Sequence, residues 1–370
     1  MTIVVHEIDP RADVIMVLKN QATEFAVWKT QQAAHADESS NTADGPQSTA
    51  DLATNPVATE DDTTDSVEED EVHYRVSSHH LMLASPWFER ALTRKGWTES
   101  TRDKTDGLYY ISAEDWDAEA FLVLMNILHL RSAKIPRTVT LDMLAKIGVI
   151  VDYYECAAVI EIWVERWLPK VKEEVTVPGV YCRDLILWIW VSWVFELPAQ
   201  FKEATQVAIR ESDETIRTLE LPIPTMISSM IDNNRSTAME FIINQLHALL
   251  DTYRNVDYMC DRRLTRGSDS QTAAQCASML SGALTRNLHH FGLLSPRPEV
   301  PFVGQSYYSL VEKIMGVDTP KWARIIEYDS YMDSSVCDVH HCALGEAISR
   351  IGWNSKIDGN VQGLEWEVLH

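Results

Sequence analysis

The sequence predicts an α+β domain at the N-terminus, followed by a mainly α-helical domain. Short runs of β-branched and aromatic residues alternate with helical patterns in the first part of the chain. Further along, apolar residues recur at helical spacing and prolines separate the helices. A chain of 370 residues with 45% hydrophobic content is long enough for two such domains. We expect them at residues 8–168 and 175–355, with a C-terminal tail over residues 356–370.

The N-terminal domain opens with two β-type runs. The run DVIMVL covers residues 13–18, and the run EFAVWK covers residues 24–29. Both are short, apolar and rich in residues that favour strands, so we expect them to form a hairpin. Tyr74 and Val76 predict the end of a further strand.

A change of composition separates these runs from the next strand. Residues 30–74 contain no Lys or Arg, whereas residues 37–71 contain twelve acidic side chains. Such a segment buries too little apolar surface to offset the entropy cost of ordering it, so we predict a disordered acidic insert over residues 31–71. The cost of closing a loop grows slowly with its length, so an insert of this size is compatible with a folded domain.

The segment YRVSSHHLMLASPWFERALTRKGWTE, residues 74–99, predicts a strand end followed by two short helices. Ser85-Pro86 suits the start of the second helix, because proline is tolerated in the first helical turn. Four apolar residues recur at roughly helical spacing along the segment: Leu81, Ala84, Phe88 and Leu92.

These residues resemble the BTB/POZ domain, in the variant that is common in fungal proteins. In that family a strand ends in Val-Ser-Ser, a Leu-x-x-x-Ser-Pro-x-Phe run follows, and a Glu-bearing turn comes next. The broader family usually has His where this chain has Ser77. The resemblance covers roughly residues 8–168 and implies a short sheet capped by helices. The matching residues are Val76-Ser77-Ser78, Leu81, Ser85-Pro86-Trp87-Phe88 and Trp97-Thr98-Glu99.

Strand and helix patterns alternate up to residue 168. Residues 108–111 predict a strand, and residues 114–117 start a helix with an apolar face. Thr140 is suited to cap the next helix, because its side chain can accept a backbone hydrogen bond. A last helix carries Trp167, and we expect Pro169 to end it.

The C-terminal domain is predicted from three helical patterns. Residues 185–197, LILWIWVSWVFEL, are apolar on every side and too short for a membrane span of ~20 residues, which indicates a central buried helix. Thr237 and Glu240 have the spacing of a capping box at the start of another helix. A later helix carries apolar residues on one face: Ala273, Cys276, Ala277, Leu280, Leu284 and Leu288.

The net charge and the cysteine content limit the classes of partner and the cellular compartment that fit this chain. The formal net charge of −23 argues against nucleic acid or an anionic membrane as a partner, because either requires a basic face. The N-terminus lacks the cationic and apolar regions of a secretory signal. Six cysteines spread over such a chain indicate reduced thiols, so we expect an intracellular protein of the cytoplasm or nucleus.

Catalytic motifs are absent from the sequence. It contains no phosphate loop, dinucleotide fingerprint, nucleophile elbow, zincin helix or EF-hand loop, so we predict a protein without enzymatic activity. The adjacent His79 and His80 would diverge around a helix. We therefore expect one packed and one exposed ring at this position instead of a metal-binding pair.

Cysteine and histidine residues gather near the C-terminus. Thiolate and imidazole suit tetrahedral zinc, and the candidate ligands are Cys260, Cys276, Cys337, His340 and Cys342. Their intervals differ from those of a paired Cys-x-x-Cys knuckle. Cys276 also lies on an apolar helical face, where thiols commonly pack. We expect no cofactor, and structural zinc stays the alternative to buried or incidental cysteines.

The BTB/POZ resemblance implies protein–protein interaction, either self-association as a homodimer or recruitment of another protein. Members of the wider family dock cullin scaffolds through a turn with an apolar-x-Glu element. Trp97-Thr98-Glu99 occupies the matching place here, so the first hypothesis is an adaptor for a cullin-type ubiquitin ligase. The same residues also fit an interpretation in which Trp97 covers the core and Glu99 is solvated.

A second hypothesis comes from a different functional class. In it, the chain is a regulatory homo-oligomer whose helical domain binds a ligand or a structural metal. A third, an enzyme in the helical half, requires a catalytic site that the linear sequence hides.

Overall fold

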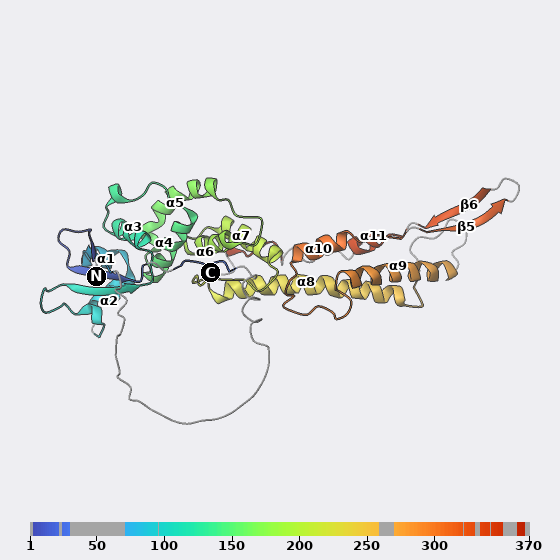
Figure 1. The fold of residues 1–370 in the computed structure, drawn as a ribbon, viewed down its shortest axis with the longest axis horizontal. Coiled ribbons are helices and arrows are strands. Elements are labelled where there is room, and N and C mark those ends of the chain that lie inside the picture. Colours follow the sequence, from blue (N-terminus) through green and yellow to red (C-terminus); the bar gives the residue numbers. More distant parts are fainter. Residues whose placement is uncertain are drawn as a thin grey trace, which may run out of the picture. The chain divides into compact units, whose positions relative to one another are not determined.

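The computed structural model describes residues 3–21, 24–29, 71–94, 96–258, 270–320, 322–329, 334–340, 342–350 and 361–366. Their fold is α+β and divides into two compact units (Figure 1). Unit 1 comprises Met1–Thr176 with Leu219–Leu221, and unit 2 comprises Val177–Thr218 with Pro222–His370. Apart from Glu71, the predicted acidic insert over residues 31–71 lies outside the described residues.

A four-stranded sheet with the order β1-β3-β2-β4 forms the base of unit 1. Its strands are β1 (Val4–Glu7), β2 (Val14–Lys19), β3 (Val72–Val76) and β4 (Tyr109–Glu114). β2 pairs antiparallel with β3 and parallel with β4, whereas β1 runs parallel to β3 at the edge. The strand predicted at residues 13–18 is therefore confirmed, and so is the strand that ends at Val76.

The strand predicted at residues 24–29 is wrong. These residues are described and form no strand. Ala26 has a φ of 48°, in the left-handed region, which interrupts an extended backbone. The two sides of β2 are already occupied by β3 and β4, so the antiparallel partner of the first strand comes from beyond the insert.

Five α-helices occur among the described residues of unit 1. The two short helices predicted within residues 74–99 are confirmed, and the side chain of Ser85 accepts a hydrogen bond from the Phe88 amide at 3.1 Å. The side chain of Thr140 caps its helix in the same way, through the Met143 amide at 3.1 Å. The helices are α1 (Ser78–Ala84), α2 (Pro86–Thr93), α3 (Ala118–Leu128), α4 (Leu141–Tyr153) and α5 (Ala157–Glu174).

The prediction that Pro169 ends the last helix of unit 1 is wrong, because α5 continues to Glu174. Pro169 is exposed, whereas Trp167 and Val171 on either side of it are buried. The indole Nε1 of Trp167 also donates a hydrogen bond to the Pro136 carbonyl at 2.9 Å. Burial of these two side chains outweighs the loss of one backbone hydrogen bond at the proline.

Buried aromatic rings form the core of unit 1. Phe88 from α2 stacks on Tyr154 at the end of α4, with 4.4 Å between ring centroids. Tyr74 from β3 lies 4.8 Å from Phe121 of α3, and its hydroxyl donates to the Ala118 carbonyl at 3.0 Å. These contacts join the sheet to the helices that follow it.

Unit 2 is mainly helical in its described residues. Every residue from 185 to 191 is buried in α6, which confirms the predicted central helix. A two-stranded antiparallel sheet between α10 and α11 was not predicted. None of the helices in the described part of the chain is long and apolar enough to cross a membrane. The elements are α6 (Arg183–Val194), α7 (Pro198–Glu211), α8 (Thr225–Arg254), α9 (Ser270–His290), α10 (Tyr307–Met315), β5 (Trp322–Asp329), β6 (Ser334–His340) and α11 (Leu344–Arg350).

The capping box predicted at Thr237 and Glu240 is wrong, because α8 passes through both residues without a break. The buried face of the helix continues across this point through Ile231, Arg235 and Ala238. Packing of the residues before and after Thr237 therefore keeps α8 continuous, although the local sequence favours a helix start there.

Arg235 is a fully buried cation inside unit 2. Its guanidinium donates to the Ser212 carbonyl at 2.9 Å, to the Pro301 carbonyl at 2.9 Å and to the Phe302 carbonyl at 3.0 Å. Burial lowers the pKa of Arg235, while Asp232 and Asp213 act in the opposite direction. The three carbonyl contacts replace the water that a buried guanidinium loses, and they hold two connecting segments on α8.

Candidate functional site

The connection between α2 and β4 carries Trp97-Thr98-Glu99. Trp97 directly precedes a short 3₁₀ helix over Thr98–Ser100, and its side chain is 37% exposed. Its ring packs edge-on against Trp87 of α2, with 5.9 Å between the centroids. Trp97 is therefore supported on one face and open to solvent on the other.

Short-range hydrogen bonds hold this turn in one conformation. The Ser100 hydroxyl and amide both donate to the Trp97 carbonyl, at 2.7 Å and 3.2 Å. The Thr98 hydroxyl donates to the half-buried Glu99 carboxylate at 3.0 Å. The turn presents an aromatic ring and a carboxylate from a backbone whose polar groups are largely paired.

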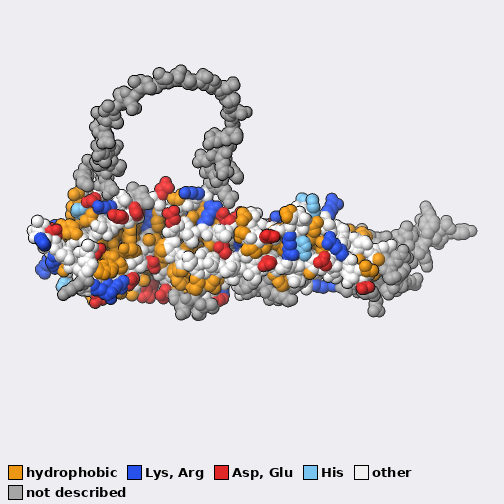
Figure 2. Space-filling view, turned by 90° about the horizontal axis from the view of Figure 1, so that it is seen from below, with side chains coloured by type: hydrophobic (Ala, Val, Ile, Leu, Met, Phe, Trp, Pro, Cys, Tyr) orange, Lys and Arg blue, Asp and Glu red, His pale blue; other side chains and the backbone are white. Residues whose placement is uncertain are grey.

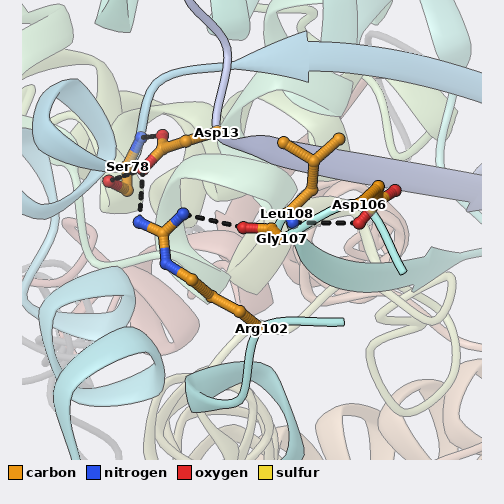
Figure 3. A network of polar contacts seen from close by, with 6 residues as sticks. All are labelled: Asp13, Ser78, Arg102, Asp106, Gly107 and Leu108. Atoms are coloured by element: carbon orange, nitrogen blue, oxygen red, sulfur yellow. Dashed lines mark hydrogen bonds and ion pairs between the residues drawn. The ribbon is translucent and has the colours of Figure 1, made fainter. Parts of the chain in front are cut away.

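A network around Arg102 joins the far end of the connection to the sheet (Figure 3). The Arg102 guanidinium donates to the Gly107 carbonyl at 2.8 Å and to the Asp13 carboxylate at 3.2 Å. Asp13 also accepts from the amide and the hydroxyl of Ser78, at 2.8 Å and 2.7 Å, where α1 begins. The Leu108 amide donates to Asp106 at 2.9 Å. The connection is thus tied to the start of β2 and to the start of α1.

The electrostatics of this network favour an ionised Asp13. Partial burial by itself would raise the pKa of Asp13, but the hydrogen bonds from Ser78 and the charge of Arg102 outweigh it. The pKa of Asp13 consequently lies below its ordinary value. The Arg102 guanidinium also lies over the Tyr109 ring, 4.3 Å from its centroid, so the network is stabilised from β4 as well.

Four partly exposed aromatic residues form a continuous surface next to this turn, which we call the aromatic surface: Trp87, Trp97, Trp116 and Tyr153. Tyr153 is 52% exposed and lies 5.7 Å from Trp87 and 5.0 Å from Trp116, centroid to centroid. Trp87 and Trp116 are half-buried and both contact the buried Tyr154 beneath them, at 5.0 Å and 5.2 Å. The aromatic surface is an outward extension of the core of unit 1.

Acidic and basic side chains both lie near the aromatic surface, and exposed Arg94 is one of the basic ones. Arg90 donates to the Glu155 carboxylate at 2.9 Å, so these two charges compensate each other. Burial and the nearby Glu155 raise the pKa of Asp152, which adjoins Tyr153. Among the described residues, no cation pairs with Asp152 or Glu99. The border therefore suits a partner segment that brings a Lys or Arg side chain beside an apolar one.

The adjacent histidines have the arrangement that the sequence predicts. His79 is exposed, whereas His80 is half-buried and stacks on His129, with 5.0 Å between the rings. The Nε2 atom of the buried His129 accepts from the Ser77 amide at 2.9 Å, so its Nδ1 atom carries the proton and donates to the Met125 carbonyl at 2.8 Å. These rings link α1 to the end of α3.

The predicted metal ligands are only partly described. Cys260 and the side chains of Cys337 and His340 lie outside the described residues, although β6 includes the backbone of the latter two. Cys276 is buried on α9, and Cys342 is half-buried. No cluster of three or more His, Cys, Asp or Glu side chains that could hold a metal ion occurs among the residues whose side chains are described. The absence of a cofactor stays the expectation, and structural zinc stays the alternative to it.

An open groove of about 720 Å³ runs along α9 in unit 2. Figure 2 shows His side chains next to Lys and Arg side chains in the part of the view that Figure 1 assigns to α8 and α9. The groove is lined on one side by small and polar residues of α9, with Arg286 and His290 at its end, and on the other by Asp318 and Thr319. The permanently charged side chains of this lining are one Arg and one Asp, so the lining favours neither an anionic nor a cationic ligand.

Sequence reasoning identified Trp97 and Glu99 but missed Trp116 and Tyr153. Trp116 lies two residues after the end of β4, and Tyr153 is the last residue of α4. A tryptophan in a connecting segment and a tyrosine next to the charged Asp152 are unusual for core residues, and this local context is a signal that could have identified them.

Comparisons of the chain with models of protein families, with curated proteins and with solved structures found no match. The geometry of the aromatic surface and of the anchored turn is therefore the basis on which a function can be proposed.

Proposed function

We propose that this chain is an intracellular, non-catalytic protein–protein interaction protein, and that unit 1 is a BTB/POZ-like domain that recruits a partner. The order of elements in unit 1 supports the proposal: a strand pair joined across the insert, a pair of short helices, a strand, and further helices. Ser85-Pro86-Trp87-Phe88, which carries much of the resemblance, starts α2.

The observation that carries the recruitment proposal is Trp97, 37% exposed on an anchored turn and continuous with three other aromatic side chains. Trp and Tyr are enriched among the residues that dominate binding energy at protein interfaces. A turn that is already ordered loses little conformational entropy when a partner binds. The aromatic surface therefore combines a large apolar contact area with a small ordering cost.

The BTB/POZ resemblance indicates which class of protein the partner belongs to. Members of the wider family dock cullin scaffolds through an apolar-x-Glu turn, and Trp97-Thr98-Glu99 has that pattern on the connection between α2 and β4. The proposed partner is accordingly a cullin-type scaffold, with the chain as an adaptor for a ubiquitin ligase. Self-association as a homodimer is the other activity that the resemblance implies.

Two substitutions test the recruitment proposal in the full-length chain. We expect Trp97→Ala and Glu99→Lys to weaken capture of a cullin scaffold, with a loss of roughly thirtyfold or more in affinity for the tryptophan. Thermal stability should change little for Glu99→Lys, because a carboxylate near the surface contributes little to folding, and more for Trp97→Ala, because that ring packs on Trp87. Binding is measured by pull-down and by titration of the purified scaffold.

Matched controls lie on the exposed side of α5. Ile162 is 69% exposed and Glu165 is exposed on the same helix, so Ile162→Ala removes an exposed apolar side chain, and Glu165→Lys repeats the charge reversal, at positions outside the aromatic surface. Both controls should bind like the unmodified chain. Equal capture by Trp97→Ala, Glu99→Lys and the controls would show that recruitment uses another surface.

A second candidate function is a regulatory homo-oligomer whose helical unit binds a ligand or a structural metal. The groove along α9, which offers polar and charged side chains to a ligand, favours this alternative. Metal analysis of the purified chain tests the zinc version. About one zinc per chain, with loss of stability on chelation, would support it. A well-folded preparation without metal is the result that we expect.

A further inference from the structure

A short segment near the C-terminus, residues 361–366, lies on α6 and α7 within unit 2; we call it the terminal segment. The Leu364 amide donates to the Thr205 hydroxyl at 2.9 Å, and Arg210 Nε donates to the Val361 carbonyl at 2.9 Å. Both acceptor and donor side chains belong to α7. Two polar side chains of α7 therefore form hydrogen bonds with the backbone of the terminal segment.

Three apolar side chains of the terminal segment are buried or packed against aromatic rings. Val361 is 2% exposed and Leu364 is 3% exposed. The Trp366 ring lies 5.0 Å from Trp193 of α6 and 5.3 Å from Phe201 of α7, centroid to centroid. The segment therefore has apolar anchors at its first, fourth and sixth positions.

Gly363 fits where no other residue can. Its φ is +92°, and a Cβ added to it would lie 2.1 Å from the Lys202 carbonyl oxygen and 3.1 Å from the Gln206 Cβ. The first of these contacts is with backbone, which cannot move aside as a flexible side chain could. The next residue but one, Glu365, forms an ion pair with Lys202. The contacts define a pattern of Val, any residue, Gly, Leu, acid and Trp.

The hydrogen bonds, ring contacts and close backbone approach described for this pattern come from α6 and α7. Every contact above joins the terminal segment to one of these two helices, which follow each other directly in the chain. The terminal segment itself forms no strand or α-helix. Recognition of a short segment by apolar pockets, a close backbone approach and a few hydrogen bonds is how domains bind peptide ligands.

We propose that α6 and α7 form a peptide-binding groove, that residues 361–366 are its intramolecular ligand, and that a partner protein carrying the same pattern enters by displacing them. A tethered ligand acts at an effective concentration on the order of millimolar, so the groove is closed to weak competitors. Ordering a six-residue segment costs entropy that offsets much of the gain from its apolar anchors, which makes exchange feasible. This autoinhibitory contact is independent of the function proposed for unit 1.

The test uses the full-length chain with Gly363→Ala, which removes the fit of the tethered ligand and leaves every groove residue in place. Gly345→Ala is the matched control, because a Cβ there meets nothing within 4 Å. The probe is a fluorescent synthetic peptide with residues 359–368, GNVQGLEWEV. We expect it to bind the Gly363→Ala chain about tenfold or more tightly than the unmodified chain or the control. A peptide that itself carries Gly363→Ala should bind none of them.

Equal binding of the probe to all three chains, or no binding to the Gly363→Ala chain, would overturn the proposal. A second measurement covers the case in which that variant fails to fold. A protease site inserted between residues 350 and 361 of the otherwise unmodified chain allows the terminal segment to be cut free. After cleavage, excess unlabelled peptide should exchange with the segment while circular dichroism stays constant. Unfolding on release, or a segment that never exchanges, would show that residues 361–366 are part of the core.

Discussion

At the scale of single residues, His129 shows how burial fixes a side chain's chemical state. Its Nε2 atom accepts from the Ser77 amide, which requires the neutral form with the proton on Nδ1. Burial lowers the pKa of His129, the neighbouring His80 acts in the same direction, and Asp9 opposes them. The folded chain therefore binds a proton at this site less readily than the unfolded chain.

This difference predicts that stability falls as the pH drops through the ordinary histidine pKa of 6.5. Below that value the unfolded chain gains a proton that folded His129 resists, so acid favours unfolding. We expect the free energy of unfolding to decrease between about pH 7.5 and about pH 5.5, and His129→Asn to reduce that decrease. Chemical denaturation at the two pH values measures it. His79→Asn is the control, because His79 is exposed, and an unchanged pH dependence in His129→Asn would contradict the assignment.

At the scale of elements, Phe88 packs α2 against the core of unit 1. The ring is fully buried and stacks on Tyr154, while the Phe88 amide completes the Ser85 cap. We expect Phe88→Ala to lower the free energy of unfolding by about 3–5 kcal/mol, because a buried ring is lost and a cavity remains. Denaturant titration measures the change.

A neighbouring position provides the control for that substitution. Leu83 on α1 is 90% exposed, so Leu83→Ala removes apolar atoms that are not buried and should leave the midpoint almost unchanged. An equal effect of the two substitutions would mean that α2 does not pack on the core through Phe88.

The elements that the sequence predicts well are those with strong local signals. Thr140 caps its helix as expected, the second short helix starts at Pro86 as expected, and residues 185–191 of α6 are all buried. The errors arise where distant contacts decide. The partner of β2 lies beyond the insert, and burial on both sides of Pro169 and Thr237 overrides a local stop and a local start.

The residues of the candidate site also fall into those that the sequence alone identifies and those that only the fold brings together. Trp97 and Glu99 belong to a contiguous motif, so the sequence alone identifies them. Trp116 comes from the connection between β4 and α3 and Tyr153 comes from α4, and only the fold brings their ring centroids to 5.0 Å from each other. The groove for the terminal segment was not predicted either, since its fit depends on the approach of Gly363 to the Lys202 carbonyl.

At the scale of the whole molecule, the negative charge is unevenly distributed along the chain. Twelve acidic side chains lie within residues 37–71, in a region without Lys or Arg, so the remainder of the chain has a net charge of −11. That remainder contains all the described helices and strands. The composition of the insert predicts that it adds charge and loop length without adding apolar surface to a core.

We therefore expect that deleting residues 32–70 leaves the chain folded and slightly more stable. The connection between β2 and β3 spans 52 residues, and the deletion shortens it to 13. Two halvings of the loop length lower the free-energy cost of closing the loop by about 1 kcal/mol.

Thermal unfolding of the deleted and unmodified chains measures the effect. A Gly/Ser replacement of equal length is the control, because it removes the acidic residues but keeps the loop length. A melting temperature several degrees lower after deletion, but unchanged in the replacement, would show that the shortened connection strains the pairing of β2 with β3. A decrease in both would show that the acidic residues themselves contribute to the folded structure.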